Sequence, residues 1–279
     1  MKNTIAQREI KETWKVNHQR KSATHTVGAV LPFDDMRRFD PFLIMAEDKF
    51  GSGTFDFHPH RGMETVTYVL DGELHHKDNK GGHGILHAGD AQWMTAGSGL
   101  IHQEAPPEGT MVHTLQLWVN LPKANKMATP RYQDISGKDV PVRKEDGAEY
   151  RVYSGNSANV VSPTKNHVPV TMVEMRIEAG HTASQDLPAD YRGFIYVLEG
   201  SGEFGKNGIH AEKGEVLLLG DVHEGTDTTA ITIKANSNLR VLLYAGRPLN
   251  EPIAARGPFV MNTDEEIAQA YADFRAGKF

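Results

Sequence analysis

The chain has 279 residues, a formal net charge of −6 and no cysteine. This length can bury a sizeable core without disulfide or metal staples, and it fits two domains of ordinary size better than one. The lack of cysteine excludes disulfides, zinc–thiolate clusters and a cysteine nucleophile. The acidic balance gives no general attraction to nucleic acid, whose binding depends on clustered lysine and arginine, so direct nucleic-acid binding is not expected.

The sequence gives no sign of export or of membrane insertion. The segment MKNTIAQREIKETWK lacks the apolar run of a signal peptide. No stretch approaches the roughly twenty apolar residues of a membrane-spanning helix. We therefore expect a cytoplasmic protein that does not bind membranes.

Two short histidine motifs carry the chemistry of the first half of the chain. His58 and His60 lie in FHPHRG, and His102 and Glu104 repeat their two-residue spacing in GSGLIHQEAP. On a β-strand, residues two apart leave the same face. A lone His-x-His is more often a surface or hydrogen-bonded pair, but the second pair favours a shared site. Three imidazoles and one carboxylate suit a divalent transition metal with open positions better than Ca²⁺ or Mg²⁺.

The segments around these motifs read as strands of one antiparallel unit. ETVTYVL is rich in β-branched and aromatic residues, and turns are predicted at Asp71-Gly72 and at Ala88-Gly89-Asp90, before AQWMTAG. His75 and His76 follow the first turn and are expected to be exposed. His113 is interpreted as a hydrogen-bonded strand-end histidine rather than as a group behind the site. In LQLWVNLP, the pattern does not settle whether Gln116 and Trp118 face the site.

The second half of the chain repeats the pattern of the first. A new set of elements begins near Ser136, YVLEG echoes the earlier YVLDG, and AEKGEVLLLGD echoes LHAGDAQWMTAG. This repeat predicts an N-terminal domain over residues 1–135 and a C-terminal domain over 136–279. His181 has no second histidine at two-residue spacing, and the adjacent His223 and Glu224 would face opposite sides of a strand. We therefore expect one metal site, in the first copy only.

A helix is predicted near the end of the chain. Thr263 and Glu266 form a capping-box pattern, and the acidic residues between them suit the helix N-terminus. An apolar stripe follows at the spacing i, i+3, i+4 and i+7, formed by Ile267, Ala270, Tyr271 and Phe274. We expect this stripe to dock within the chain, with binding to a partner as the alternative.

HPHRGMETVTYVLDGEL, AGDAQWMTAGSGLIHQE, LQLWVNLP and GRPLNEPIAARGPFVMNT resemble the pirin family of the cupin superfamily, and together they cover most of the chain. The resemblance implies an all-β fold, with two cupin-type antiparallel β-sandwiches or barrels (a bicupin) and a short C-terminal helix. It also implies one iron ion held by His58, His60, His102 and Glu104, although Mn²⁺, Co²⁺, Ni²⁺, Cu²⁺ or Zn²⁺ would suit the same donors.

The chain departs from the general cupin pattern at one ligand position. Counting back from Gly72, the expected glutamate is replaced by Thr65, and Glu64 is one residue out of phase. A one-residue offset sends a strand side chain to the opposite face. Glu64 is therefore expected to lie behind the site or on the surface, and Glu104 to take its place as the carboxylate ligand.

Some pirin-like proteins are similar to quercetin 2,3-dioxygenases, so the resemblance implies a small aromatic substrate, such as a flavonol, and O₂. Glu104 would then act both as a ligand and as the base that accepts the substrate's proton. Candidate pocket walls are Phe55, Phe57, Trp93 and Met94. Two other functions remain open. One is an iron-dependent transcriptional co-regulator that binds a protein partner, and the other is a non-oxidative cupin isomerase.

Overall fold

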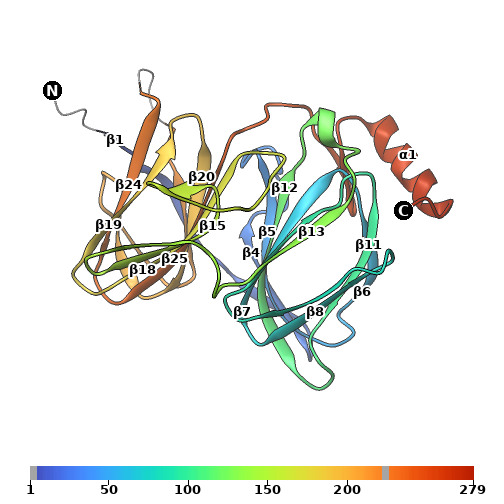
Figure 1. Cartoon of the computed structure of the whole chain (residues 1–279), viewed down its shortest axis with the longest axis horizontal. Helices are drawn as coiled ribbons and strands as arrows, with labels where there is room; N and C mark the ends of the chain where they lie inside the picture. The colour runs from blue at the N-terminus through green and yellow to red at the C-terminus, as the bar shows by residue number, and fades with distance from the viewer. Residues whose placement is uncertain (1–4, 222–225) are drawn as a thin grey trace. The chain divides into compact units, whose positions relative to one another are not determined.

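The computed structural model describes residues 5–221 and 226–279. It divides into two compact units, each built from two stretches of the chain (Figure 1). The N-unit comprises residues 17–139 and 249–279, and the C-unit comprises residues 1–16 and 140–248. His223 and Glu224, which the sequence offered as a broken second motif, lie outside the described residues.

The expected domains were residues 1–135 and 136–279, and the structure divides the chain nearby, after residue 139. The two ends of the chain differ from that expectation, because each belongs to the unit formed mainly by the other half. Residues 1–16 join the C-unit, where β2 (Ile10–Lys15) pairs with β23 (Glu215–Leu219). Residues 249–279, with the C-terminal helix, join the N-unit. A repeat pattern locates the break between two copies. It cannot show which sheet a flanking segment joins, because the pairing partner lies far away in the sequence.

Two antiparallel sheets form the N-unit. The strand order is β13-β10-β7-β12-β5-β4-β3 in the larger sheet and β6-β11-β8-β9 in the smaller. The strands of the larger sheet are β3 (His18–Ser22), β4 (His25–Leu31), β5 (Phe42–Gly51), β7 (Met63–Asp71), β10 (Ala91–Thr95), β12 (Met111–Asn120) and β13 (Arg131–Ile135). Those of the smaller sheet are β6 (Phe55–His60), β8 (Glu73–Asp78), β9 (His83–His87) and β11 (Leu100–Ala105).

The interior of the N-unit is lined from both sheets. Phe50, Val69 and Val112 of the larger sheet pack with Leu74 and Leu86 of the smaller one. Strands that contribute to such an interior alternate between buried and more exposed residues. In β11 the buried positions are Leu100, His102 and Glu104. The strand periodicity therefore brings a histidine and a glutamate into the same interior as the apolar core.

The predicted C-terminal helix is confirmed as α1 (Asp264–Arg275), with a complete capping box. The Thr263 hydroxyl accepts from the Glu266 backbone N–H at 3.2 Å, and the Glu266 carboxylate accepts from the Thr263 N–H at 3.1 Å. Ile267 and Ala270 are buried in a cluster that includes residues of β27 (Phe259–Met261). The apolar stripe therefore docks within the chain. The remaining elements of the N-unit are β26 (Ala254–Arg256) and the short 3₁₀ helix η1 (Lys123–Asn125).

The C-unit repeats the two-sheet plan. Its larger sheet has the order β14-β15-β18-β25-β20-β23-β2, and the smaller has β1-β24-β21-β22 with β19 also paired to β24. The bounds are β1 (Ala6–Gln7), β14 (Val142–Glu145), β15 (Ala148–Ser154), β16 (Asn156–Ser157), β17 (Val160–Val161), β18 (Val170–Ile177), β19 (Thr182–Pro188), β20 (Arg192–Glu199), β21 (Ser201–Phe204), β22 (Ile209–Glu212), β24 (Thr228–Ala235) and β25 (Leu239–Gly246).

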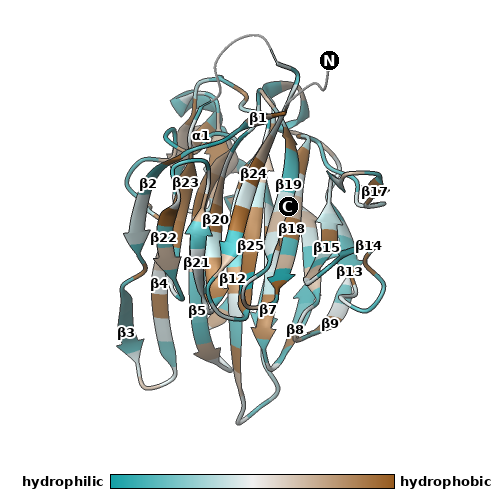
Figure 2. Cartoon of the chain, turned by 90° about the vertical axis from the view of Figure 1, so that its left-hand side faces the viewer, coloured by the Kyte–Doolittle hydropathy of each residue, from teal (hydrophilic) through white to brown (hydrophobic). Residues whose placement is uncertain are grey.

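Hydrophilic and hydrophobic residues follow one another along strands of the C-unit such as β24 (Figure 2). The inward residues form one apolar cluster, which includes Val173, Ile195, Ile231 and Leu243. The chain is thus an all-β bicupin with one C-terminal helix, as predicted. Among the described residues, no helix is long and apolar enough to cross a membrane.

Candidate metal centre

Three histidines meet where β6 and β11 pair in antiparallel register. His102 lies opposite His58, and Leu100 lies opposite His60. The ring centroids are 4.4 Å apart for His58 and His102, 4.9 Å for His58 and His60, and 5.0 Å for His60 and His102. One nitrogen from each ring lies within 4.8 Å of the others. The two-residue spacing and the strand pairing therefore bring together three of the four side chains that the sequence singled out.

Two of these imidazoles are buried with ring nitrogens that have no hydrogen-bond partner. His60 is 3% exposed and His102 is 1% exposed. Both nitrogens of His60 and Nε2 of His102 are unpartnered. The Pro258 carbonyl lies near enough to His60 to favour the protonated ring slightly, without a hydrogen bond of normal geometry. Leaving buried nitrogen atoms unpaired costs free energy. A cation at this point would give them a partner.

Burial also keeps these rings neutral. Together with a smaller effect of the neighbouring His58, it lowers the pKa of His60 to about 3. Burial likewise lowers the pKa of His102 well below its usual value, with the other imidazoles adding to the effect. A neutral imidazole carries the lone pair that a metal ligand needs. The donor set therefore fits a divalent transition metal in charge state as well as in position.

His58 is half-buried, and a backbone carbonyl fixes its tautomer. Its Nδ1 lies 2.7 Å from the carbonyl oxygen of Asp56. Because a carbonyl can only accept, Nδ1 carries the proton and Nε2 keeps the free lone pair. Metal-binding histidines usually donate their second ring nitrogen in this way. Of the three rings, His58 is the one with access to solvent.

Glu104 shares the buried interior, but its carboxylate is held on the other side of His102. A register shift between His102 and Glu104 places Glu104 opposite Phe55. Its carboxylate accepts from Gln116 Nε2 at 2.7 Å and from the Thr67 hydroxyl at 3.1 Å. A carboxylate oxygen of Glu104 lies within 4.8 Å of a ring nitrogen of His102 and of His76. It does not belong to the set formed by His58, His60 and His102. Two donor sets thus overlap at His102.

The expectation that His76 is exposed is wrong. His76 is 2% exposed, and its Nδ1 lies 3.5 Å from Nδ1 of His102. Its Nε2 has no hydrogen-bond partner, and burial lowers its pKa. His75, on the opposite face of β8, is half-buried and pairs with Glu73 at 2.6 Å. Leu74 is buried two residues before His76. That spacing was the available signal that His76 faces inward.

Glu64 faces away from the histidines, as its position on the strand predicted, but it does not lie on the surface. On β7, Thr67 contacts Glu104, whereas Glu64 accepts from Trp93 Nε1 at 3.0 Å and from the Thr95 hydroxyl at 2.7 Å. Residues three apart on a strand face opposite sides. Glu64 therefore points away from the histidines. It is nevertheless fully buried, so a surface position is excluded.

The structure also settles which face of β12 sees the site. Gln116 donates to Glu104, and the Trp118 ring lies 5.3 Å from the His60 ring, edge to face. His113 Nε2 instead lies 2.7 Å from Glu47, in agreement with the interpretation of a hydrogen-bonded strand-end histidine. Gln116 and Trp118 therefore belong to the surroundings of the centre.

The four predicted wall residues lie in different environments. Phe55 is 6.5 Å from the His58 ring, and Met94 packs with Leu100. Trp93 is on the far face with Glu64, and Phe57 is exposed. The cavity beside Glu104 measures about 10 Å³ and is lined by Asp48, Phe50, Phe55, Thr67, Leu74, Glu104, Thr114 and Gln116. That volume is roughly what one water molecule needs. A flavonol is far too large for this side of Glu104.

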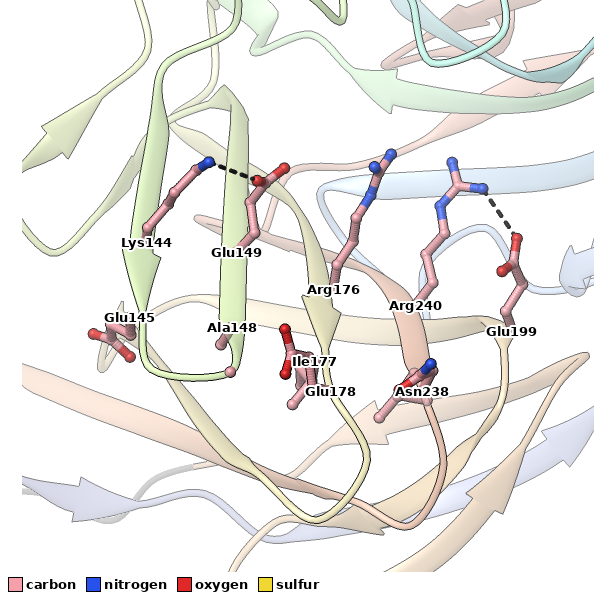
Figure 3. Close-up of a pocket in the computed structure, with 12 residues that line it drawn as sticks. Lys144, Glu145, Ala148, Glu149, Arg176, Ile177, Glu178, Glu199, Asn238 and Arg240 are labelled. Carbon is pink, nitrogen blue, oxygen red and sulfur yellow. Dashed lines mark hydrogen bonds and ion pairs between the residues drawn. The ribbon is translucent and has the colours of Figure 1, made fainter.

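The C-unit carries a groove lined mainly by charged side chains. A groove of about 790 Å³ is lined by residues such as Lys144, Glu149, Arg176, Arg240 and Glu199, and by no histidine (Figure 3). Lys144 pairs with Glu149 at 3.4 Å, and Arg240 pairs with Glu199 at 3.3 Å. Within the described part of the C-unit, no three histidine, aspartate or glutamate side chains bring their donor atoms within 4.8 Å of one another.

Two family models match the chain. A model described as Pirin covers residues 13–119, and one described as Pirin C-terminal cupin domain covers residues 172–279. The chain is 40% identical to Pirin-1 of Arabidopsis thaliana over 248 residues, which span 88% of this chain and 85% of that protein. It is 39% identical to Pirin of Homo sapiens over 248 residues, 88% of this chain and 84% of the relative.

Three solved structures are also similar. GK1651 from Geobacillus kaustophilus has a TM-score of 0.87 and 53% identity, covering 89% of this chain and all of that one. A quercetin 2,3-dioxygenase from Acinetobacter baumannii has a TM-score of 0.87 and 31% identity, with 98% and 99% coverage. The bacterial pirin YhhW from Escherichia coli, in complex with nickel(II), has a TM-score of 0.66 and 25% identity, with 88% and 99% coverage.

Proposed function

Since the chain belongs to the pirin family, we propose that it holds one divalent transition metal in the N-unit and oxidises a flat aromatic substrate, such as a flavonol, with O₂. The observation that carries this proposal is the set of buried, neutral imidazole nitrogens without hydrogen-bond partners at His60 and His102. The similarity to a quercetin 2,3-dioxygenase and to a nickel(II)-bound pirin supports it.

His58, His60 and His102 would hold the metal, with Glu104 as the carboxylate ligand. These donors suit iron(II), which we propose as the native metal, and they would also accept Mn²⁺, Co²⁺, Ni²⁺, Cu²⁺ or Zn²⁺. Once bound, such a metal supplies Lewis acidity and open positions for oxygen chemistry. To join the three imidazoles, the Glu104 side chain would have to turn from the Gln116 side of His102 toward them.

Glu104 is also the proposed base. A flavonol hydroxyl must lose its proton to bind as an anion, and Glu104 is the carboxylate beside the histidines that can accept it. Gln116 and Thr67 donate hydrogen bonds to the Glu104 carboxylate, which orients both of its oxygens. These two residues hold the Glu104 carboxylate on the Gln116 side of His102 until its side chain turns toward the three imidazoles.

The substrate is proposed to approach from the His58 side. The cavity on the Gln116 side of Glu104 holds about one water. His58, in contrast, is half-buried, while His60 and His102 are closed off from solvent. The Trp118 ring against His60 and the Phe55 ring near His58 give the site apolar edges that suit an aromatic molecule.

The test is oxygen-dependent loss of quercetin. Protein loaded in turn with Fe²⁺, Mn²⁺, Co²⁺, Ni²⁺ or Cu²⁺ is incubated with quercetin in air and without air, while flavonol absorbance and O₂ uptake are followed. Glu104→Gln should still bind some metal but slow turnover by about 10²- to 10⁴-fold, because it removes the base. Glu64→Gln is the matched control and should keep both metal and activity, since Glu64 lies on the far face of β7. Wild-type protein that consumes neither quercetin nor O₂ with any of these metals contradicts the substrate assignment.

A second candidate is a redox-sensing protein that binds a partner, as the co-regulator alternative implies. Phe57 is exposed and directly precedes His58, so a change at the metal could alter an apolar surface residue. A metal-dependent partner complex without quercetin turnover would favour this function. The isomerase alternative has less support, because the rings of Trp118 and Phe55 give the site apolar edges, whereas an isomerase of small polar substrates would need polar or basic side chains there.

A further inference from the structure

We propose that the ion pair between Arg61 and Asp273 is a positioning device for the metal centre, through which helix α1 fixes the spacing of the two ligand strands. The inference rests on the proposed function, since it concerns the same metal. Arg61 directly follows His60 at the end of β6, and Asp273 lies in the last turns of α1. Neither residue contacts the metal ligands through its own side-chain hydrogen bonds.

The Arg61 guanidinium joins three segments of the N-unit. The side chain is only 5% exposed. Its Nε donates to the Ser98 carbonyl at 2.8 Å, and Nη1 donates to the Asp273 carboxylate at 2.8 Å. Its charge lies 4.3 Å from the centre of the Phe279 ring. Only arginine presents a planar fork that can serve two acceptors and an aromatic face at once.

These contacts connect the residues that follow His60 with those that precede His102. Ser98 lies in the turn before β11, and in the same turn Gly97 accepts from the Gly62 N–H at 2.8 Å. Arg61 therefore ties the end of one ligand strand to the start of the other. Asp273 holds the same guanidinium from helix α1. Losing Asp273 would leave a buried charge with only carbonyl and aromatic partners, and the guanidinium would be drawn toward solvent.

Asp273 is well suited to this role. Hydrogen bonds from Arg61, then Lys278 and Gln269, hold the pKa of Asp273 well below its usual range, so it is ionised at working pH. Lys278 reaches the other oxygen, Oδ1, at 2.9 Å and is 62% exposed. Oδ2 is left to Arg61. The two charged partners of Asp273, Arg61 and Lys278, thus differ in burial, which provides an internal comparison.

Hydrogen bonds from Lys126 also hold the turn that follows Arg61. Lys126 Nζ donates to the Gly62 carbonyl at 2.8 Å, to the Val260 carbonyl at 2.9 Å and to Asn120 Oδ1 at 2.6 Å. Gly62 has φ +79°, and a side chain there would collide with the Val260 carbonyl oxygen. The segment that contains β27 therefore lies directly against the turn that follows His60.

These contacts to the turn after His60 matter because few other contacts orient the His60 ring. Neither nitrogen of its ring has a hydrogen-bond partner, so its position depends on packing and on the backbone that Arg61 anchors. Groups that orient metal ligands without binding the metal typically contribute about 10- to 100-fold to affinity. We therefore expect the Arg61–Asp273 pair to affect metal binding by about the same factor.

The experiment measures Co²⁺ binding by competition with a chelator at 25 °C, together with the visible absorption spectrum of the Co²⁺-loaded protein. Asp273→Asn should bind Co²⁺ about 10- to 100-fold more weakly and change the spectrum, which reports ligand geometry. Lys278→Gln is the matched control. It removes the exposed partner of Asp273 and should leave affinity and spectrum unchanged.

Arg61→Lys tests the other end of the pair and replaces Asp273→Asn if that variant fails to fold, as judged by thermal unfolding of the metal-free protein. The double variant Asp273→Asn/Arg61→Lys should lose little more affinity than either single variant, because the two residues act as a unit. Wild-type affinity and spectrum in both single variants overturn the inference, as does an equal loss in Lys278→Gln. Wild-type protein that binds no divalent metal overturns the proposed function itself, and this inference with it.

Discussion

At the scale of single residues, the three histidines of the centre differ in whether a ring nitrogen has a hydrogen-bond partner. His58 donates Nδ1 to a backbone carbonyl, and Nδ1 of His102 faces Nδ1 of His76. Neither ring nitrogen of His60 has a hydrogen-bond partner. If Nε2 of His102 binds the metal, its Nδ1–H is available to donate to His76. His76 would then orient His102 in the way that a carbonyl orients His58.

A comparison of two neighbouring histidines tests this role. His76→Ala should weaken metal binding by about 10- to 100-fold, since it removes the group behind His102. His75→Ala should leave affinity unchanged, because His75 faces away and pairs with Glu73. Chelator competition with Ni²⁺ measures both variants. Equal affinities for the two would contradict the assignment of His76 to the centre.

The neutral state of His60 predicts a pH dependence of stability in the metal-free protein. The pKa of His60 falls from 6.5 to about 3 on folding. Between these values the unfolded chain binds one more proton, so the free energy of unfolding decreases as the pH falls, by about 1.4 kcal/mol per pH unit for this residue. Above pH 6.5 both states are neutral and the dependence on this group ends.

Urea unfolding of the metal-free protein from pH 4 to pH 7 measures this effect. His60→Gln should show a shallower dependence than wild type, by about one proton in the slope. Carboxylates also titrate in this range and contribute to both proteins, so only the difference between the two slopes is diagnostic. Identical slopes would show that His60 is not buried in its neutral form.

The sequence predicted that His58, His60 and His102 lie together, because residues two apart on a strand share a face, and the three rings do meet. Their role as metal ligands, and that of Glu104, stays a prediction. The sequence could not give the rotamer of Glu104, which depends on Gln116 and Thr67 of two other strands. It also missed His76, although the buried Leu74 two residues earlier marks the same face. Strand pairing decides such contacts, and one sequence shows only the periodicity within each strand.

At the scale of elements, the sequence predicted that helix α1 forms, but not the surface on which it docks. Thr263 and Glu266 specify the helix start locally, and the capping box is present in the structure. The surface on which the helix docks was not predictable in the same way. It lies on β27 of the N-unit, whereas the expected boundaries assigned the helix to the C-terminal domain.

Thr263→Ala should lower the free energy of unfolding by about 1 kcal/mol, the usual cost of losing an N-cap side chain. Because Ile267 and Ala270 still pack on β27, the helix should remain docked. Thr263→Ser is the conservative control, since serine caps as well as threonine. Chemical denaturation of both variants measures the difference. A loss of several kcal/mol in Thr263→Ala would show that docking, and not only the cap, depends on this residue.

At the scale of the whole molecule, the two units share a fold and differ in what their interiors hold. The repeat in the sequence predicted the bicupin, and the structure confirms it. In the C-unit, the inward residues of β19 are Ala183, Gln185 and Leu187, where β6 of the N-unit brings histidines. Gln185 already bonds Ser157 at 2.5 Å. This strand therefore offers apolar or satisfied side chains in place of free imidazole nitrogens.

The proposed function depends on one metal ion per chain, bound to the histidines of β6 and β11. Elemental analysis of purified protein, after loading with Fe²⁺ or Ni²⁺ and removal of unbound metal, tests it most directly, with His60→Ala measured in parallel. We expect one equivalent per chain in the wild type and almost none in the variant. Two tightly held equivalents, no metal in the wild type, or one equivalent that survives in His60→Ala would contradict it.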